Sequence, residues 1–164
     1  MFEFGAGHSS AWYGRHAGRV VSVDDSAAWL KKVRPLVGSN VELLHRVSKT
    51  GTDLSAEGDS AYAGALTEYP PGSFDIIVVD GKERVACAQT APSRLRDGGL
   101  IIFDNSDKPK FKPGLGLDFL HAHEFGRIDF SGPVAQVGTF NCTSVFAKNW
   151  ERWVQNVPVV FQGW

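Results

Sequence analysis

The chain has 164 residues, a formal net charge of −1 and 43% hydrophobic residues. This length suits one domain with a buried core, and the near-zero charge without runs of like charge gives no reason to expect a nucleic acid or an anionic membrane as a partner. No apolar run is long enough to cross a bilayer, and the acidic Glu3 stands where a signal peptide would be basic. Cys87 and Cys142 form neither a disulfide pattern nor a metal-binding pattern. We therefore expect a reduced, cytoplasmic protein that acts on small molecules.

The first ten residues have the pattern of a strand that runs into a glycine turn and then into a helix. Phe2 and Phe4 supply apolar strand positions, and Gly5 and Gly7 permit positive φ and close backbone approach. Ser9 or Ser10 is a suitable N-cap for the helix. The start of such a helix presents unpaired backbone N–H groups to whatever lies over the turn. The pattern therefore indicates a site for a nucleotide-like cofactor.

A second apolar run, Val20–Val23, is followed directly by Asp24. A carboxylate at this point of nucleotide-binding folds accepts hydrogen bonds from ribose hydroxyls. The turn before it departs from the dinucleotide pattern G-x-G-x-x-G, because Ser10 stands at the third glycine position. We therefore expect Asp24 to mark the ribose end of the site.

Short apolar runs alternate with helical segments along the chain, which is typical of an α/β domain with a mainly parallel sheet. We expect strands at Phe2–Phe4, Arg19–Val23, Val41–Val47, Phe74–Val79 and Gly99–Phe103. Helices are expected at Ser10–His16, Ser26–Val33, Ser60–Glu68 and Arg84–Leu95, with Pro92 kinking or shortening the last of them. The polar stretch Gly51–Gly58 is expected to be a loop.

The two strongest strands each end in an acid. Asp80 follows the strand at Phe74–Val79, and Asp104 and Asn105 follow the strand at Gly99–Phe103. In an open parallel sheet the ligand site lies beyond the carboxyl ends of the strands. We therefore expect these three polar residues and Asp24 to converge on the edge that carries the glycine turn.

The last third of the chain is expected to complete the sheet with an antiparallel pair. The expected elements, in chain order, are a loop at Lys108–Gly116, a helix at Leu117–His123, a strand at Arg127–Phe130, a connecting loop at Gly132–Asn141 and a strand at Thr143–Ala147. An apolar tail then packs either on its own domain or on a second subunit of a homodimer, because a large exposed apolar patch is unusual in a monomer. Its apolar residues are Trp150, Trp153, Val157, Val159, Val160, Phe161 and Trp164.

The acid Glu3, the glycines Gly5 and Gly7 and the hydroxyl residue Ser9 together resemble the first cofactor motif of class I S-adenosylmethionine-dependent methyltransferases. The resemblance implies that the turn lies beside the methionine part of S-adenosylmethionine and that Asp24 holds the ribose. The cofactor-binding residues that it implies are Glu3, Gly5, Gly7, His8, Ser9, Asp24 and Asp80, and the adenine pocket would draw on Asp59 or Tyr62.

The same resemblance implies a Rossmann-like, doubly wound α/β fold with a mainly parallel sheet and a C-terminal antiparallel strand. Residues 1–148 would form the S-adenosylmethionine-binding methyltransferase domain, and residues 149–164 an aromatic C-terminal tail. Such enzymes generally carry helices ahead of the first strand, and these are missing before Met1. The chain is therefore expected to be either a shortened enzyme or a fragment of a longer product.

Asp80, Asp104 and Asn105 resemble the magnesium site of catechol O-methyltransferase and its relatives, in which two aspartates and an asparagine hold the ion. Such an ion would bind an acceptor hydroxyl, lower its pKa and orient it. Those enzymes place a catalytic lysine where Glu83 stands here, which leaves the neighbouring Lys82 as its substitute. We expect methyl transfer to a small molecule, at oxygen, with Asp80 and Lys82 as catalytic residues. In the alternative, Asp104 and Asn105 cap a turn and hold no metal.

Two other functions remain open at this point. A nicotinamide-dependent oxidoreductase is disfavoured by Ser10 in the turn and by the lack of a catalytic Tyr-x-x-x-Lys pair in the sequence. A non-catalytic interaction module that retains the fold would fit the missing N-terminal helices.

Overall fold

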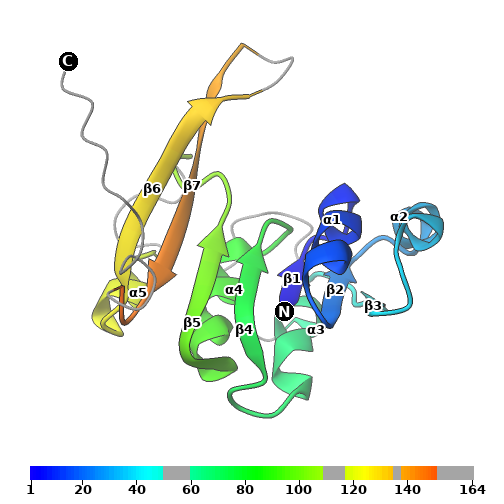
Figure 1. Cartoon of the computed structure of the whole chain (residues 1–164), viewed down its shortest axis with the longest axis horizontal. Helices are drawn as coiled ribbons and strands as arrows, with labels where there is room; N and C mark the ends of the chain where they lie inside the picture. Colours follow the sequence, from blue (N-terminus) through cyan, green and yellow to red (C-terminus); the bar gives the residue numbers. More distant parts are fainter. Residues whose placement is uncertain (50–59, 109–116, 135–137, 151–164) are drawn as a thin grey trace.

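A sheet of seven strands in the order β3-β2-β1-β4-β5-β7-β6 organises the protein (Figure 1). The computed structural model describes residues 1–49, 60–108, 117–134 and 138–150. The strands are β1 (Phe2–Phe4), β2 (Val20–Asp24), β3 (Val41–His45), β4 (Phe74–Val79), β5 (Leu95–Phe103), β6 (Gly126–Pro133) and β7 (Phe140–Ala147). The helices are α1 (His8–His16), α2 (Ala27–Val33), α3 (Ala61–Gly64), α4 (Arg84–Thr90) and α5 (Leu117–Ala122).

The five strands β1 to β5 are parallel, and β7 pairs antiparallel with both β5 and β6. From β1 the chain first adds strands on one side, β2 and β3, and then on the other, β4 and β5. This confirms the Rossmann-like, doubly wound sheet with a C-terminal antiparallel strand. The order reverses at β1, and in open α/β sheets the crevice at such a reversal is where ligands bind.

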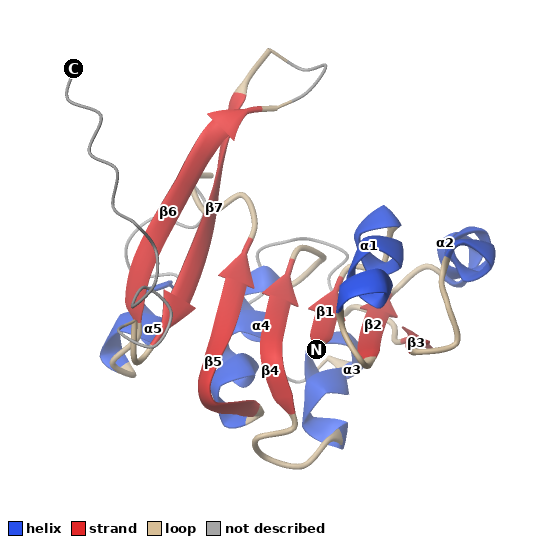
Figure 2. Cartoon of the chain, in the orientation of Figure 1, coloured by secondary structure: helices blue, strands red, loops and turns tan. Residues whose placement is uncertain are grey.

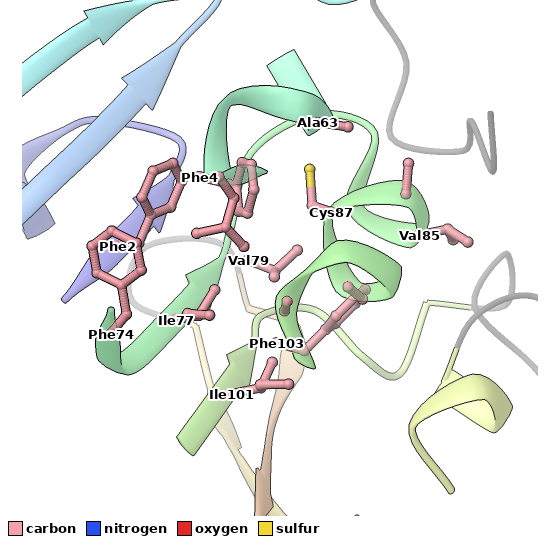
Figure 3. Close-up of a cluster of buried hydrophobic side chains, with 14 of the residues drawn as sticks. Phe2, Phe4, Ala63, Phe74, Ile77, Val79, Val85, Cys87, Ile101 and Phe103 are labelled. Carbon is pink, nitrogen blue, oxygen red and sulfur yellow. The ribbon is translucent and has the colours of Figure 1, made fainter. Parts of the chain in front are cut away.

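Helices cover both faces of the sheet (Figure 2). On one face, α3, α4 and α5 cover a core that includes Phe2, Phe4 and Phe103, shown in Figure 3. On the other face, α1 and α2 pack over Val20 and Val41, at the end of the sheet that carries β3. In β2, for example, Val21 and Val23 belong to the first core and Val20 to the second, as the period of two in a strand requires.

The expected elements are all present within the described residues, but several boundaries move. α1 begins at His8 with Gly7 as its N-cap, so Ser9 and Ser10 already lie in the first turn. The helix that starts at Arg84 ends at Thr90 and tightens into a 3-10 turn containing Pro92. Because proline cannot donate a backbone hydrogen bond, the helix does not reach Leu95, which instead opens β5.

The C-terminal hairpin is longer than expected. β6 and β7 pair from Gly126 and Ala147 to Pro133 and Phe140, so both ends of the expected loop Gly132–Asn141 belong to strands. The antiparallel register runs without a shift between these two end pairs. The predicted antiparallel pair is therefore confirmed, but its strands are longer than predicted.

Some expectations fall outside the described residues: the loop Gly51–Gly58, Asp59, all but the first residue of Lys108–Gly116, and the tail beyond Trp150. Trp150 itself is partly buried, and its Nε1 would lie 2.6 Å from a Cβ added at Gly126. Within the described ranges every helix is too short or too polar to cross a bilayer.

Candidate active site at the carboxyl edge of the sheet

Four neighbouring strands end at one level of the sheet. Phe4 is paired with Val23 on one side and with Val79 on the other, and Val79 is paired in turn with Phe103. The residues that directly follow these paired positions are Gly5, Asp24, Asp80 and Asp104. The predicted convergence of the glycine turn and the strand-end acids is therefore confirmed.

Gly5 and Gly7 play different parts in the turn. Gly5 has φ +99°, and a Cβ there would lie 2.8 Å from the backbone oxygen of Asp80, so both the conformation and the space require glycine. Gly7 has φ −173°, an extended conformation open to any residue. A Cβ at Gly7 would meet only Ser9 Oγ, at 3.8 Å. Neither backbone conformation nor packing within the described residues thus explains why position 7 is glycine.

Glu3 lies beneath this turn and is fully buried. Its carboxylate accepts hydrogen bonds from the hydroxyls of Ser9, at 2.5 Å, Ser10, at 2.5 Å, and Ser22, at 2.6 Å. Burial raises the pKa of Glu3, although the three hydroxyls act in the opposite direction. Since Ser22 stands opposite Glu3 in the β1–β2 pairing and the other two serines belong to α1, Glu3 ties the helix to both strands. It supports the turn from below.

Asp24 lies at the end of β2, partly exposed beside the turn. One carboxylate oxygen accepts the backbone N–H of Ser26 at 2.9 Å, and burial raises the pKa of Asp24. Trp29 of α2 donates its indole N–H to the backbone oxygen of Ala6 at 2.6 Å, which fixes α2 against the turn. His8 is exposed at the start of α1. Asp24 and His8 are therefore both accessible from the same edge.

The loop after β4 does not place Lys82 with the predicted metal ligands. Lys82 Nζ lies 2.6 Å from a carboxylate oxygen of Asp25, which follows β2, on the side of β4 away from β5. Glu83 has φ 48° and is fully buried, where its carboxylate accepts hydrogen bonds from the Ser60 hydroxyl and a backbone N–H. Tyr62, one of the adenine candidates, is also buried. These contacts give no support to a catalytic Lys82 or to an adenine pocket at Tyr62.

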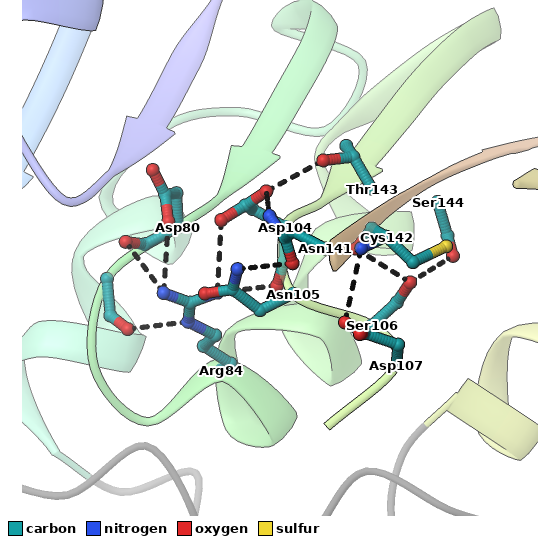
Figure 4. Close-up of polar contacts among 11 residues, drawn as sticks. Asp80, Arg84, Asp104, Asn105, Ser106, Asp107, Asn141, Cys142, Thr143 and Ser144 are labelled. Carbon is teal, nitrogen blue, oxygen red and sulfur yellow. Dashed lines mark hydrogen bonds and ion pairs between the residues drawn. The ribbon is translucent and has the colours of Figure 1, made fainter. Parts of the chain in front are cut away.

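Asp80, Asp104 and Asn105 do come together, around the guanidinium of Arg84 (Figure 4). Arg84 Nη2 lies 3.0 Å from Asp80 Oδ1, and Nη1 lies 3.2 Å from Asn105 Oδ1 and 3.8 Å from Asp104 Oδ2. Partial burial raises the pKa of Asp80 to about 7, opposed by Arg84 and assisted by Asp104. Sequence reasoning missed Arg84, and its only local signal was the spacing of four residues from Asp80.

Strand β7 supplies two further residues that the sequence did not reveal. Thr143 Oγ1 donates to Asp104 Oδ1 at 2.7 Å, and Asn141 Nδ2 donates to the same oxygen at 3.2 Å. Asn141 Oδ1 accepts from Asn105 Nδ2 at 2.6 Å. Asn105 itself has φ 56°, a conformation that asparagine tolerates in turns. The strand-end acid and amide are thus held by the antiparallel hairpin.

The predicted magnesium site does not fit these contacts. The predicted ligands are two carboxylates and one amide, and no third acidic, histidine or cysteine side chain among the described residues joins Asp80 and Asp104 in a group that could hold a metal ion. Mg²⁺ requires ligand oxygens at about 2.0–2.1 Å in octahedral geometry. The space between Asp80 and Asn105 is instead bridged by the guanidinium of Arg84.

Comparison with known proteins identifies the fold. No protein-family model matches the chain, and no curated protein is similar in sequence. An O-methyltransferase from Bacillus cereus, solved with SAH, is 18% identical with a TM-score of 0.63, covering 90% of this chain and 73% of that one. The protein has the class I S-adenosylmethionine-dependent methyltransferase fold.

Two further structures with this methyltransferase fold differ in their reactions. A 1,6-didemethyltoxoflavin-N1-methyltransferase from Burkholderia thailandensis, with bound S-adenosylhomocysteine, is 16% identical with a TM-score of 0.59, covering 90% of this chain and 69% of that one. A spermidine synthase from Thermotoga maritima is 11% identical with a TM-score of 0.62, covering 90% of this chain, which spans only 52% of that one. The methyltransferase fold therefore does not identify the acceptor of the methyl group, which has to be inferred from the residues of the site.

Proposed function

We propose that the protein binds S-adenosylmethionine at the glycine turn and transfers its methyl group to a small-molecule acceptor, at oxygen. The observation that carries this proposal is the turn itself. It lies at the reversal of the strand order, with Asp24 beside it and the N-terminus of α1 behind it. Backbone N–H groups at such a point suit the polar groups of a nucleotide-like cofactor.

The absence of a side chain at Gly7 also supports this proposal. Its extended backbone would accept any residue, and the space where a Cβ would project is nearly open. A ligand that lies directly on the turn gives a reason for glycine there, because a methyl group would hold it away from the backbone. The cofactor's methionine part is our proposal for that ligand.

Methyl transfer from a sulfonium is an in-line displacement in which the sulfur–carbon bond breaks as the bond from carbon to the acceptor forms. Positioning of the two molecules supplies much of the rate, and a base is needed only if the acceptor must lose a proton. Asp80, whose side chain is 41% exposed next to the turn, is the residue that we propose to contact the cofactor and the acceptor. Lys82, paired with Asp25, would position the loop after β4.

Calorimetric titration with S-adenosylhomocysteine tests the site through a matched pair of variants. Gly7→Ala and Gly18→Ala both add a methyl group in open space, and neither has a positive φ. We expect Gly7→Ala to lose most of its affinity without a change in melting temperature. Gly18 lies before the N-terminal end of β2, away from the turn, so Gly18→Ala should bind like the wild type. Equal affinity in the two variants would contradict the proposed site.

Asp24→Ala tests the ribose contact. It should weaken binding of S-adenosylhomocysteine by about 1.5–3 kcal/mol, as expected for hydrogen bonds to a charged group. Unchanged affinity would remove Asp24 from the site. Titration with NADH separates the alternatives: preference for NADH indicates an oxidoreductase, and binding of neither molecule indicates an interaction module. A screen of hydroxyl, amine and carboxyl acceptors for cofactor turnover then identifies the acceptor class.

A further inference from the structure

Arg84 is held by acceptors that belong to the protein itself. Its side chain is only 8% exposed. Nε donates to Gly81 O at 2.9 Å, Nη1 donates to Asp104 O at 2.5 Å and to Asn105 Oδ1 at 3.2 Å, and Nη2 donates to Asp80 O at 3.2 Å and to Asp80 Oδ1 at 3.0 Å. A guanidinium has five N–H donors, and these are five hydrogen bonds. The cation is therefore fixed in place.

The position of this cation is the one that the sequence pattern assigned to a magnesium ion. The guanidinium touches two of the three expected ligand side chains within 3.2 Å, and the third, Asp104, lies within 3.8 Å. The other carboxylate oxygen of Asp104 already accepts two hydrogen bonds from β7. A divalent ion at this point would meet a like charge in a partly buried environment, which is strongly unfavourable.

We propose that Arg84 is a permanent internal cation that replaces a divalent metal in this site, so that the protein binds no magnesium ion at Asp80, Asp104 and Asn105. For catalysis, the inference rests on the proposed methyl transfer and makes it independent of divalent metals. Arg84 acts as a positioning residue, because it holds the ends of β4 and β5 and the strand-end acids while its own donors are used within the protein.

The local backbone explains how an arginine reaches this position. Glu83 adopts a left-handed conformation directly before α4, and Arg84 then opens the helix with its side chain directed back to the strand ends. The planar fork of arginine satisfies acceptors on both strands at once, whereas the three donors of a lysine ammonium radiate from one atom. The arrangement is specific to arginine.

Titration with Mn²⁺, followed by the loss of the free-ion signal in electron paramagnetic resonance, tests the inference without any cofactor. Wild-type protein should bind no Mn²⁺ that competes with Mg²⁺. If the wild type binds one Mn²⁺ and Asp104→Asn abolishes that binding, the inference is overturned. Because the ion alone is the probe, this result is independent of whether the cofactor proposal holds.

Arg84→Met removes the charge and the donors but keeps an unbranched side chain. This variant should gain an Mn²⁺ site with an affinity at least about tenfold above that of the wild type, because two carboxylates lose their counter-ion. The gain should disappear in Arg84→Met with Asp104→Asn, and Arg84→Lys, which keeps the charge, should not show it. A folded Arg84→Met protein without the gain contradicts the inference, and if Arg84→Met does not fold, the wild-type and Arg84→Lys titrations decide.

Discussion

Gly5→Ala should be among the most destabilising single-methyl changes in the turn. At φ +99° an L-residue costs about 1–3 kcal/mol. The added Cβ would also lie 2.8 Å from Asp80 O and 2.9 Å from Gly81 Cα, which are backbone atoms that cannot swing aside. Overpacking of this kind costs about 1–3 kcal/mol more. We expect a total loss of about 2–6 kcal/mol, a large part of the stability of about 5–15 kcal/mol that is typical of a domain.

Urea unfolding followed by circular dichroism measures this loss, and Gly72→Ala is its matched control. Gly72 also has a positive φ, +71°, but nothing lies within 4 Å of the Cβ that alanine would add. Gly72→Ala should therefore show the conformational cost alone, about 1–2 kcal/mol. The difference between the two variants isolates the contact with the loop after β4. Equal midpoints for both variants would refute the argument that this close approach fixes the turn.

Three further predictions concern Glu3 and the tail. Glu3→Ala should lower the free energy of unfolding by about 2–6 kcal/mol, because the buried hydroxyls of Ser10 and Ser22 lose their acceptor; a loss below that of Ser9→Ala would contradict this. The folded state raises the pKa of Glu3 above 4.5. The stabilisation that comes from protonating Glu3 is therefore complete below pH 4.5 and is lost as the pH rises through the folded-state pKa. The wild type should gain stability relative to Glu3→Gln on acidification. Deletion of the residues after Lys148 should lower the melting temperature or dissociate a dimer, and an unchanged melting temperature and solution mass would count against it.

The sheet and the edge that carries the candidate site could be predicted from the sequence because their signals are local. Apolar runs such as Phe74–Val79 mark central strands by composition alone, and the acids that follow them lie at one edge in any parallel arrangement. The glycine turn and Asp24 could be recognised for the same reason. Boundaries were less certain, because tertiary contacts decide them: Ser10 seemed a suitable cap by residue type, yet its hydroxyl donates to Glu3 and Gly7 takes the cap position.

The roles of individual side chains at that edge depended on residues far apart in the chain. Glu3 could be placed beneath the turn only once the register of β1 and β2 set it opposite Ser22. Thr143 reaches Asp104 across 39 residues of sequence, because β7 pairs with β5 in a register that the local pattern does not specify. The sequence alone marked Asp80 and Asp104 as acids suited to a metal ion. Only the tertiary structure shows that the positive charge beside them is the guanidinium of Arg84. The effect of a charged side chain depends on its distance in space and its burial, which a sequence pattern does not give.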